Sequence, residues 1–293
     1  MSTKPMVKTV WLIIAAAFGI GLILSGLGFA LGGNAPMGIG PGGMRFVDFR
    51  TGVVYDSRME PRMVTGDTLS GVVTENINSV RVYSVSANIR IVAVDAPSNG
   101  GISYEVRPEG SLSYSVTTNG GVLTINPIQE HTVFGMGLGN FGWWSGDLDG
   151  EIIIEVPREM SFATIELSSV SGCIDADVLY ANIVQLRTVS GAIQAGTVGD
   201  SSSFASRLEI YSVSGSANVR EAYVHRLELS QVSGSSNIAL ADLQNFSVES
   251  SSISASITVG GTNLGNGTST FGSGSKAASI STISGSVNLT EVP

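Results

Sequence analysis

The segment Leu208–Val219, LEIYSVSGSANV, recurs nineteen residues later as Leu227–Ile238, LELSQVSGSSNI. The pattern occurs seven times in the chain, always around a Ser-Gly or Ser-Ala pair. The seven pairs are Ser86-Ala87, Ser171-Gly172, Ser190-Gly191, Ser214-Gly215, Ser233-Gly234, Ser254-Ala255 and Ser284-Gly285. Neighbouring copies lie 19 to 30 residues apart, except for an interval of 85 residues between the first two. Self-similarity at this period is typical of stacked repeat architectures.

Within each copy the apolar residues keep fixed positions, which are counted here as offsets from the Gly or Ala of the pair. Offsets −7, −5, −2, +2 and +4 give 35 positions in seven copies, and only Ser236 and Ser250 among them are not apolar. Offsets −6 and +3 are polar in every copy. Because side chains alternate between the two faces of a strand, offsets −2, 0, +2 and +4 are expected to face the core together. Offsets −7 and −5 have the other parity, so a corner near −4 or −3 must join two short strands.

The Ser-[Gly/Ala] pair itself is interpreted through the same parity. Ala87 and Ala255 argue against a positive φ at offset 0, because alanine does not favour that conformation. We therefore expect the small residue to face inward, where volume is limited. The preceding serine then faces outward and is expected to form a ladder of hydroxyls rather than a row of nucleophiles.

These repeats predict an all-β fold, a β-solenoid of about seven coils over residues 79–293. Residues 97–157 are expected to form an insertion between the first two coils. Its alternating runs 102–107, 112–117 and 122–128 and its strand 151–157 predict antiparallel strands. Residues 260–276, rich in Gly, Ser, Thr and Asn, are expected to be a loop that lengthens one coil.

The N-terminal part of the chain predicts one transmembrane helix. Residues 10–31 carry no charge and, as a helix about 33 Å long, would span the ~30 Å hydrocarbon core of a membrane. Lys4 and Lys8 precede this segment, so the N-terminus is expected in the cytoplasm and the rest of the chain outside. A cleaved signal peptide is the alternative, and the length of the apolar run favours the anchor. Residues 1–32 are thus assigned to a cytoplasmic tip and anchor, and 33–78 to a Gly-rich spacer and juxtamembrane segment.

Net charge disfavours two classes of partner, and the cysteine content excludes an internal disulfide. The part beyond residue 32 carries 13 basic and 24 acidic residues, a net charge of −11, which disfavours nucleic acid and anionic membrane surfaces. The single cysteine, Cys173, excludes a disulfide within the chain.

Two features could carry binding. The Gly-rich segment 134–144 contains Phe134, Phe141, Trp143 and Trp144. These aromatics are expected to contact a partner, to insert into the membrane interface or to cap an open end of the solenoid. The outward offsets −1, +1 and +3 could form a flat polar face that meets glycans through many weak hydrogen bonds. Its members in three copies are Ser214, Ser216, Asn218, Ser233, Ser235, Asn237, Ser284, Ser286 and Asn288.

Neither catalysis nor metal binding is predicted. His131 and His225 have no ligand partners at suitable spacing. Asp175 and Asp177 are similar to the paired acids of β-helical polysaccharide enzymes, but no cationic helper recurs near them in the sequence. The expected catalytic, metal and cofactor sites are therefore none, and the chain is predicted not to be an enzyme.

The strand Glu151–Pro157, followed by serial Val-Ser-Gly-x-Ile units behind one N-terminal anchor, resembles the toastrack family, the "putative adhesin" domain of bacterial envelope proteins. The resemblance covers about 79–293 and is strongest from residue 151 onward. It implies a solenoid-like all-β domain displayed outside the cell, with no catalytic residues to carry over. We accordingly expect a membrane-anchored scaffold or sensor in cell-envelope stress or organisation, with envelope proteins as partners. The alternative is a cell-surface adhesin that binds glycan or wall polymer through its Ser/Asn face.

Overall fold

A computed structural model describes residues 68–95, 101–108, 113–128 and 150–293 in full, together with the backbone of four short strands before them. The chain forms two compact units, residues 1–62 and 63–293. In the first unit β1 (Gly38–Gly40), β2 (Gly43–Asp48) and β3 (Val53–Asp56) make an antiparallel sheet. The second unit begins with β4 (Val64–Thr65) and contains all seven repeats.

The expectation of an all-β chain is confirmed for the described residues, which contain strands and one 3₁₀ turn, η1 (Leu243–Asn245), but no α-helix. Nothing in these residues is a helix long and apolar enough to cross a membrane. The expected anchor, residues 10–31, lies outside the described residues, as does the aromatic segment 134–144.

Each repeat forms one coil that crosses two sheets. In the first three copies a coil consists of two strands: β6 (Ser79–Ser84) and β7 (Asn88–Val94), β12 (Phe162–Ser169) and β13 (Ile174–Leu179), β14 (Ala181–Thr188) and β15 (Ile193–Val198). In the last four it is one continuous bent strand: β16 (Arg207–Ala222), β17 (Arg226–Leu240), β18 (Phe246–Val259) and β21 (Lys276–Glu291). Residues before the corner form the upstream sheet, and residues after it form the downstream sheet. Neighbouring coils pair in parallel with equal offsets side by side.

The insertion contains an eighth coil, which corrects the expected number of about seven. β10 (Val122–Ile128) pairs in parallel with β6, and β11 (Glu151–Pro157) pairs in parallel with β7. Leu123 and Ile125 stand beside offsets −7 and −5 of the first repeat, and Ile152 and Ile154 beside +2 and +4. This coil is hard to recognise in the sequence because residues 129–150 replace its Ser-Gly corner.

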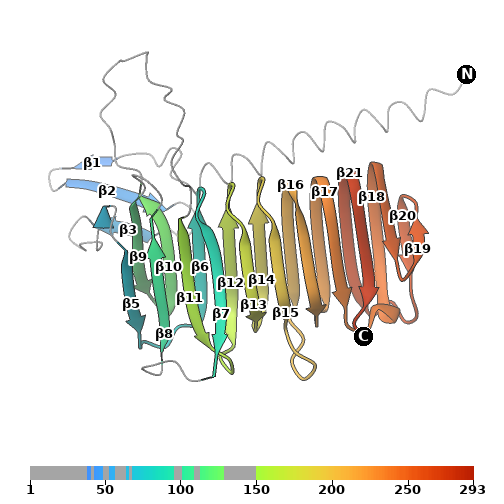
Figure 1. Cartoon of the computed structure of the whole chain (residues 1–293), viewed down its shortest axis with the longest axis horizontal. Helices are drawn as coiled ribbons and strands as arrows, with labels where there is room; N and C mark the ends of the chain where they lie inside the picture. The colour runs from blue at the N-terminus through green and yellow to red at the C-terminus, as the bar shows by residue number, and fades with distance from the viewer. Residues whose placement is uncertain are drawn as a thin grey trace, which may run out of the picture. The chain divides into compact units, whose positions relative to one another are not determined.

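The order of the coils in space differs from their order in the chain (Figure 1). From one end to the other the coils are β10/β11, β6/β7, β12/β13, β14/β15, β16, β17, β21 and β18. The last repeat, β21, is thus inserted between β17 and β18. Antiparallel strands cover both ends: β8 (Ile102–Arg107), β9 (Ser113–Asn119), β4 and β5 (Leu69–Val73) at one, and β19 (Thr262–Leu264) and β20 (Gly267–Thr270) at the other.

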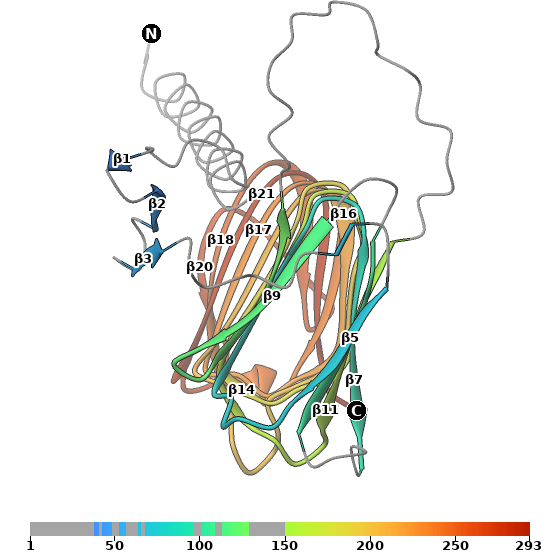
Figure 2. The same ribbon diagram turned by 90° about the vertical axis from the view of Figure 1, so that its left-hand side faces the viewer.

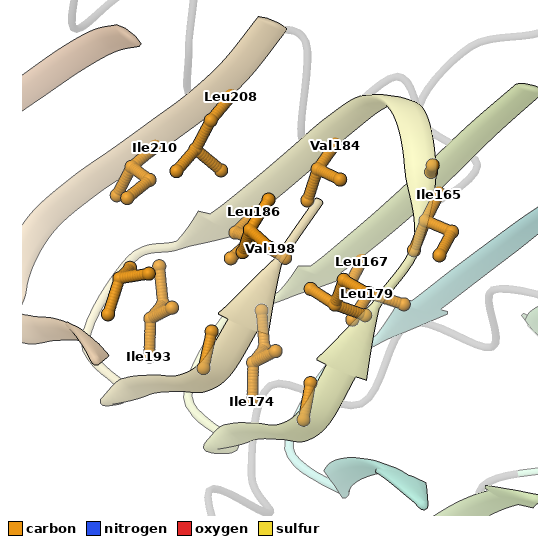
Figure 3. Close-up of a cluster of buried hydrophobic side chains, with 14 of the residues drawn as sticks. Ile165, Leu167, Ile174, Leu179, Val184, Leu186, Ile193, Val198, Leu208 and Ile210 are labelled. Carbon is orange, nitrogen blue, oxygen red and sulfur yellow. The ribbon is translucent and has the colours of Figure 1, made fainter. Parts of the chain in front are cut away.

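The core is a set of apolar columns enclosed by the coils. Figure 2 shows the backbone of the stacked coils, viewed along the stack. All 28 residues at offsets −7, −5, +2 and +4 of the seven repeats are buried, as expected. Figure 3 shows part of these columns, with Leu167, Leu186 and Ile210 at offset −5 of successive coils. The two polar exceptions are satisfied: Ser236 Oγ donates to Gln231 Oε1 at 2.5 Å, and Ser250 Oγ donates to the Gly265 carbonyl at 2.6 Å.

The expected inward position of offset −2 is wrong. Its Val and Ile side chains lie half-exposed along the corner, and Ile253, in the terminal coil β18, is 43% exposed. The buried residue is instead at offset −3, which continues the parity of −7 and −5. Six of the seven side chains at this offset are buried: Ser84, Ser169, Thr188, Ser212, Gln231 and Thr282.

The side chains at offset −3 are polar because they form hydrogen bonds with backbone N–H and C=O groups at the corner. Thr188 Oγ1 accepts a hydrogen bond from the Gly191 N–H at 2.8 Å, and Ser169 Oγ accepts one from the Gly172 N–H at 2.9 Å. In other coils the side chain donates instead, as Gln231 Nε2 does to the Gly234 carbonyl at 2.8 Å. A buried backbone group without a partner would cost about 1–3 kcal/mol, so these polar side chains stabilise the bends at which they form such bonds. Ser212 Oγ, in the same column, is buried without a hydrogen-bond partner among the described residues.

Glycine at offset 0 is required by the carbonyl of the adjacent coil. A Cβ on Gly191 would lie 2.1 Å from the Gly172 oxygen, and one on Gly215 would lie 2.0 Å from the Gly191 oxygen. The expected volume limit therefore exists, but it comes from the stacking of coils and not from a narrow core. The expectation that offset 0 avoids a positive φ is wrong for Gly234 and Gly285, whose φ angles are 125° and 108°. A Cβ at offset 0 faces the preceding coil of the stack, and for Ala87 the corner of that coil lies outside the described residues. Ala255 has Gly285 as its neighbour on that side, and the stacking does not explain why it is an alanine.

We predict that Gly191→Ala lowers the free energy of unfolding by about 1–3 kcal/mol, because the new methyl group would overlap a backbone oxygen. Gly265→Ala is the matched control, since a Cβ there has no atom within 4 Å, and its effect should stay within about 0.5 kcal/mol. Urea unfolding of the full chain measures both. Equal stabilities of the two variants would contradict the stacking limit.

We also predict that Thr188→Val destabilises the protein by about 1–3 kcal/mol, although the two side chains have nearly the same shape. The change leaves the buried Gly191 N–H without the Thr188 acceptor. Thr290→Val, at an exposed position of β21, is the control and should be close to neutral in the same unfolding measurement. A neutral Thr188→Val would show that the corner does not need this hydrogen bond.

Candidate binding surface on the downstream sheet

The outer face of the downstream sheet carries an uninterrupted column of polar side chains at offset +3. Each pair of neighbours in this column is in direct register across two adjacent coils. All of them are exposed or half-exposed. In spatial order the polar column consists of Arg90, Asp175, Gln194, Asn218, Asn237, Asn288 and Thr258.

The predicted Ser/Asn face lies at the centre of this column. Asn237 Nδ2 donates to Asn218 Oδ1 at 3.1 Å, and Asn288 stands next to Asn237 on the other side. A parallel column at offset +1 adds the hydroxyls of Ser216, Ser235, Ser286 and Ser256. The predicted face uses the repeats of β16, β17 and β21. These three are adjacent in space only because β21 lies between β17 and β18. The structure therefore brings the predicted residues together as one surface.

An open depression of about 250 Å³ lies at the end of the polar column nearest the insertion. It is formed by the first three repeat coils and the start of β11. Its lining residues are Asn88, Ile89, Arg90, Glu151, Cys173, Ile174, Asp175 and Gln194. Sequence reasoning missed this site because Glu151 belongs to the unrecognised eighth coil.

Opposite charges are paired around the depression. Arg90 Nε lies 3.9 Å from Asp175 Oδ2, and Arg107 Nη1 lies 2.8 Å from Glu151 Oε2. The hydrogen bond to Glu105 raises the pKa of Arg107. Arg90 is thus a cation beside Asp175 that the linear sequence did not reveal, although both residues occupy offset +3 of successive repeats. Because these side chains are well exposed, such pairs contribute little to stability and can exchange partners with a ligand.

The outer face of the upstream sheet has a different character. Glu166 and Glu209 are 3% and 5% exposed, and Arg187 bridges them through contacts of 2.6 Å to Glu166 and 3.6 Å to Glu209. Arg207 Nη1 adds a contact of 2.9 Å to Glu209. Burial, together with the charge of Glu209, raises the pKa of Tyr211 next to this network. Since these charges compensate one another across the coils, this face is organised as a structural ion-pair ladder.

Five of the serines at offset −1 donate a hydrogen bond to a backbone carbonyl of the adjacent coil. Ser171 Oγ donates to the Val85 carbonyl at 3.2 Å, and Ser190 Oγ donates to the Val170 carbonyl at 3.3 Å. Ser233, Ser254 and Ser284 make the corresponding contacts at 3.3–3.4 Å. These hydroxyls help to hold adjacent corners together.

The remaining candidates are placed as follows. Phe141, Trp143 and Trp144 lie outside the described residues, as does His131. His225 is exposed, with its ring 5.5 Å from that of Phe204. Asp177 is exposed beyond the depression. Within the described ranges no three His, Cys, Asp or Glu side chains are grouped to hold a metal ion.

Comparisons with known proteins complete the description. No family model matches the chain, and no curated protein matches it. Among solved structures, it is similar to a "putative cell adhesion protein" from Clostridium sporogenes, at 12% identity and a TM-score of 0.38 over 77% of this chain and 99% of that one. A "putative adhesin" from Bacteroides fragilis matches at 10% identity and a TM-score of 0.38, over 76% and 97% of the two chains. A "putative lipid binding protein" from Parabacteroides distasonis matches at 12% identity and a TM-score of 0.34, over 66% and 70%.

Proposed function

We propose that the protein is a non-catalytic, membrane-anchored surface module whose β-solenoid binds a neutral polysaccharide outside the cell. The proposal takes the adhesin alternative of the toastrack resemblance. The expected role in envelope stress came from the toastrack resemblance, with Phe141, Trp143 and Trp144 as its candidate partner-binding residues. These three lie outside the described residues, whereas the described residues favour the polar face. Wall polymers and other extracellular glycans are the partners in view.

The in-register amides of Asn218, Asn237 and Asn288 are the observation that carries this proposal. An asparagine amide offers two donors and an acceptor, which suits sugar hydroxyls. The serine hydroxyls of the +1 column lie in the same register, so the surface repeats the same Ser and Asn pair in the three adjacent coils β16, β17 and β21. Repetition supplies many weak contacts that add up along a polymer.

The electrostatics of this surface favour an uncharged ligand. Offsets +1 and +3 carry no charged side chain from β16 to β18, including β21. The part of the chain beyond residue 32 has a net charge of −11, which would repel a polyanion at low salt. The charged groups at the depression are already paired with one another.

We predict that Asn237→Leu weakens retention on an insoluble neutral polysaccharide by about tenfold, because it removes hydrogen-bonding groups worth roughly 0.5–1.5 kcal/mol each. The measurement is co-sedimentation of the purified full chain with cellulose and with chitin. Ser230→Leu, on the same strand but on the outer face of the upstream sheet, is the matched control and should leave retention unchanged.

Two results would sink the proposal. One is the absence of retention on any neutral polysaccharide by a folded protein. The other is equal loss of retention in Asn237→Leu and Ser230→Leu, which would remove the polar face from the interaction. Thermal unfolding by circular dichroism confirms that both variants remain folded.

A further inference from the structure

The direction of the polar column sets the direction of any polymer bound to it. The column crosses seven coils, and strands are about 4.7–4.9 Å apart, so it is roughly 29 Å long. Along one strand, the outward positions −1, +1 and +3 span only about 13 Å at ~3.3 Å per residue. A chain lying along the stack therefore meets more equivalent groups than a chain lying along a strand.

The repeat of the column also resembles that of a polysaccharide. One coil advances by about 4.8 Å, close to the length of a single sugar unit in an extended β-linked chain. Each sugar can then meet the same pair of offsets, +1 and +3, on its own coil. In the centre these pairs are Ser216 with Asn218 and Ser235 with Asn237.

The two ends of the column are chemically different. At β18 the last repeat residue of the column is Thr258, whose register partner on the covering strand β19 is Asn263. At the other end the column enters the 250 Å³ depression, where Arg90 and Asp175 stand side by side. Carboxylate and guanidinium groups there can bind vicinal hydroxyls, which a terminal sugar exposes.

We propose that the polar column is a track for one linear, neutral, β-linked polysaccharide chain that runs along the stack with one sugar per coil. Its terminal sugar occupies the depression beside Arg90 and Asp175. This inference rests on the proposed function and adds the class of ligand, its orientation and the length of chain that is recognised.

The test is a length series measured on the purified full chain by isothermal titration calorimetry. The probes are β-1,4-linked oligomers of glucose and of N-acetylglucosamine, from two to eight sugars long. Affinity for one of the series should rise with each added sugar and level off at about seven, the number of coils in the column.

Two variants test the orientation. Asn288→Leu should abolish the gain in affinity beyond the fifth sugar while leaving the binding of trisaccharides unchanged, because Asn288 is the sixth member of the column from the depression. Asp175→Ala should weaken binding of every length by a similar factor. Ser230→Leu again serves as the control and should reproduce the whole length series.

The outcomes separate this inference from the function on which it rests. Binding that is equally tight for a disaccharide and a heptasaccharide would overturn the track while leaving glycan binding intact. Loss of trisaccharide binding in Asn288→Leu would overturn the placement of the chain end. An oligouronate of the same lengths is the charged comparison, and binding to it alone would contradict a neutral ligand. Absence of binding to any of the probes would overturn both proposals.

Discussion

The structure depends on the close approach of backbones at the corner of each coil. Parallel stacking brings the carbonyl of one coil to the place where a Cβ of the next would stand, as at Gly191 and Gly215. Glycine avoids this overlap, and buried hydroxyls such as that of Thr188 accept hydrogen bonds from backbone N–H groups at the corner. Only then can both sheets keep the same spacing, which places equal offsets of every coil side by side.

Surface function follows from that spacing. Because the register at offset +3 is the same in every pair of adjacent coils, a polar residue at this offset of one repeat becomes a member of a column. The same rule organises the opposite outer face, where Glu166, Arg187 and Glu209 compensate one another and leave a closed ion-pair ladder. The two faces differ in what they offer a partner, because one is a network of paired charges and the other presents repeated, uncharged amides and hydroxyls.

Much of this arrangement was predictable from the sequence, and the failures have physical causes. The alternation of side chains along a strand correctly predicts the four buried columns, because the apolar side chains at −7, −5, +2 and +4 leave water only by facing the core. It fails at −2 and −3, since hydrogen bonding at the corner outweighs hydrophobicity there and buries Thr188 while Val189 stays half-exposed. The eighth coil was missed because its two halves are separated in the chain. The position of β21 depends on pairing between distant strands, which no local pattern encodes.

The order of the coils is the claim on which the polar column depends, and disulfide cross-linking tests it most directly. In a Cys173→Ser background, Asn237→Cys with Asn288→Cys should oxidise readily, since neighbouring strands bring Cα atoms within the 4.4–6.8 Å range of a disulfide. Asn237→Cys with Thr258→Cys should remain reduced, because β21 separates the two positions to roughly 9–10 Å. Cross-linking of the second pair and not the first would show that the coils stack in the order of the sequence, and would contradict the account.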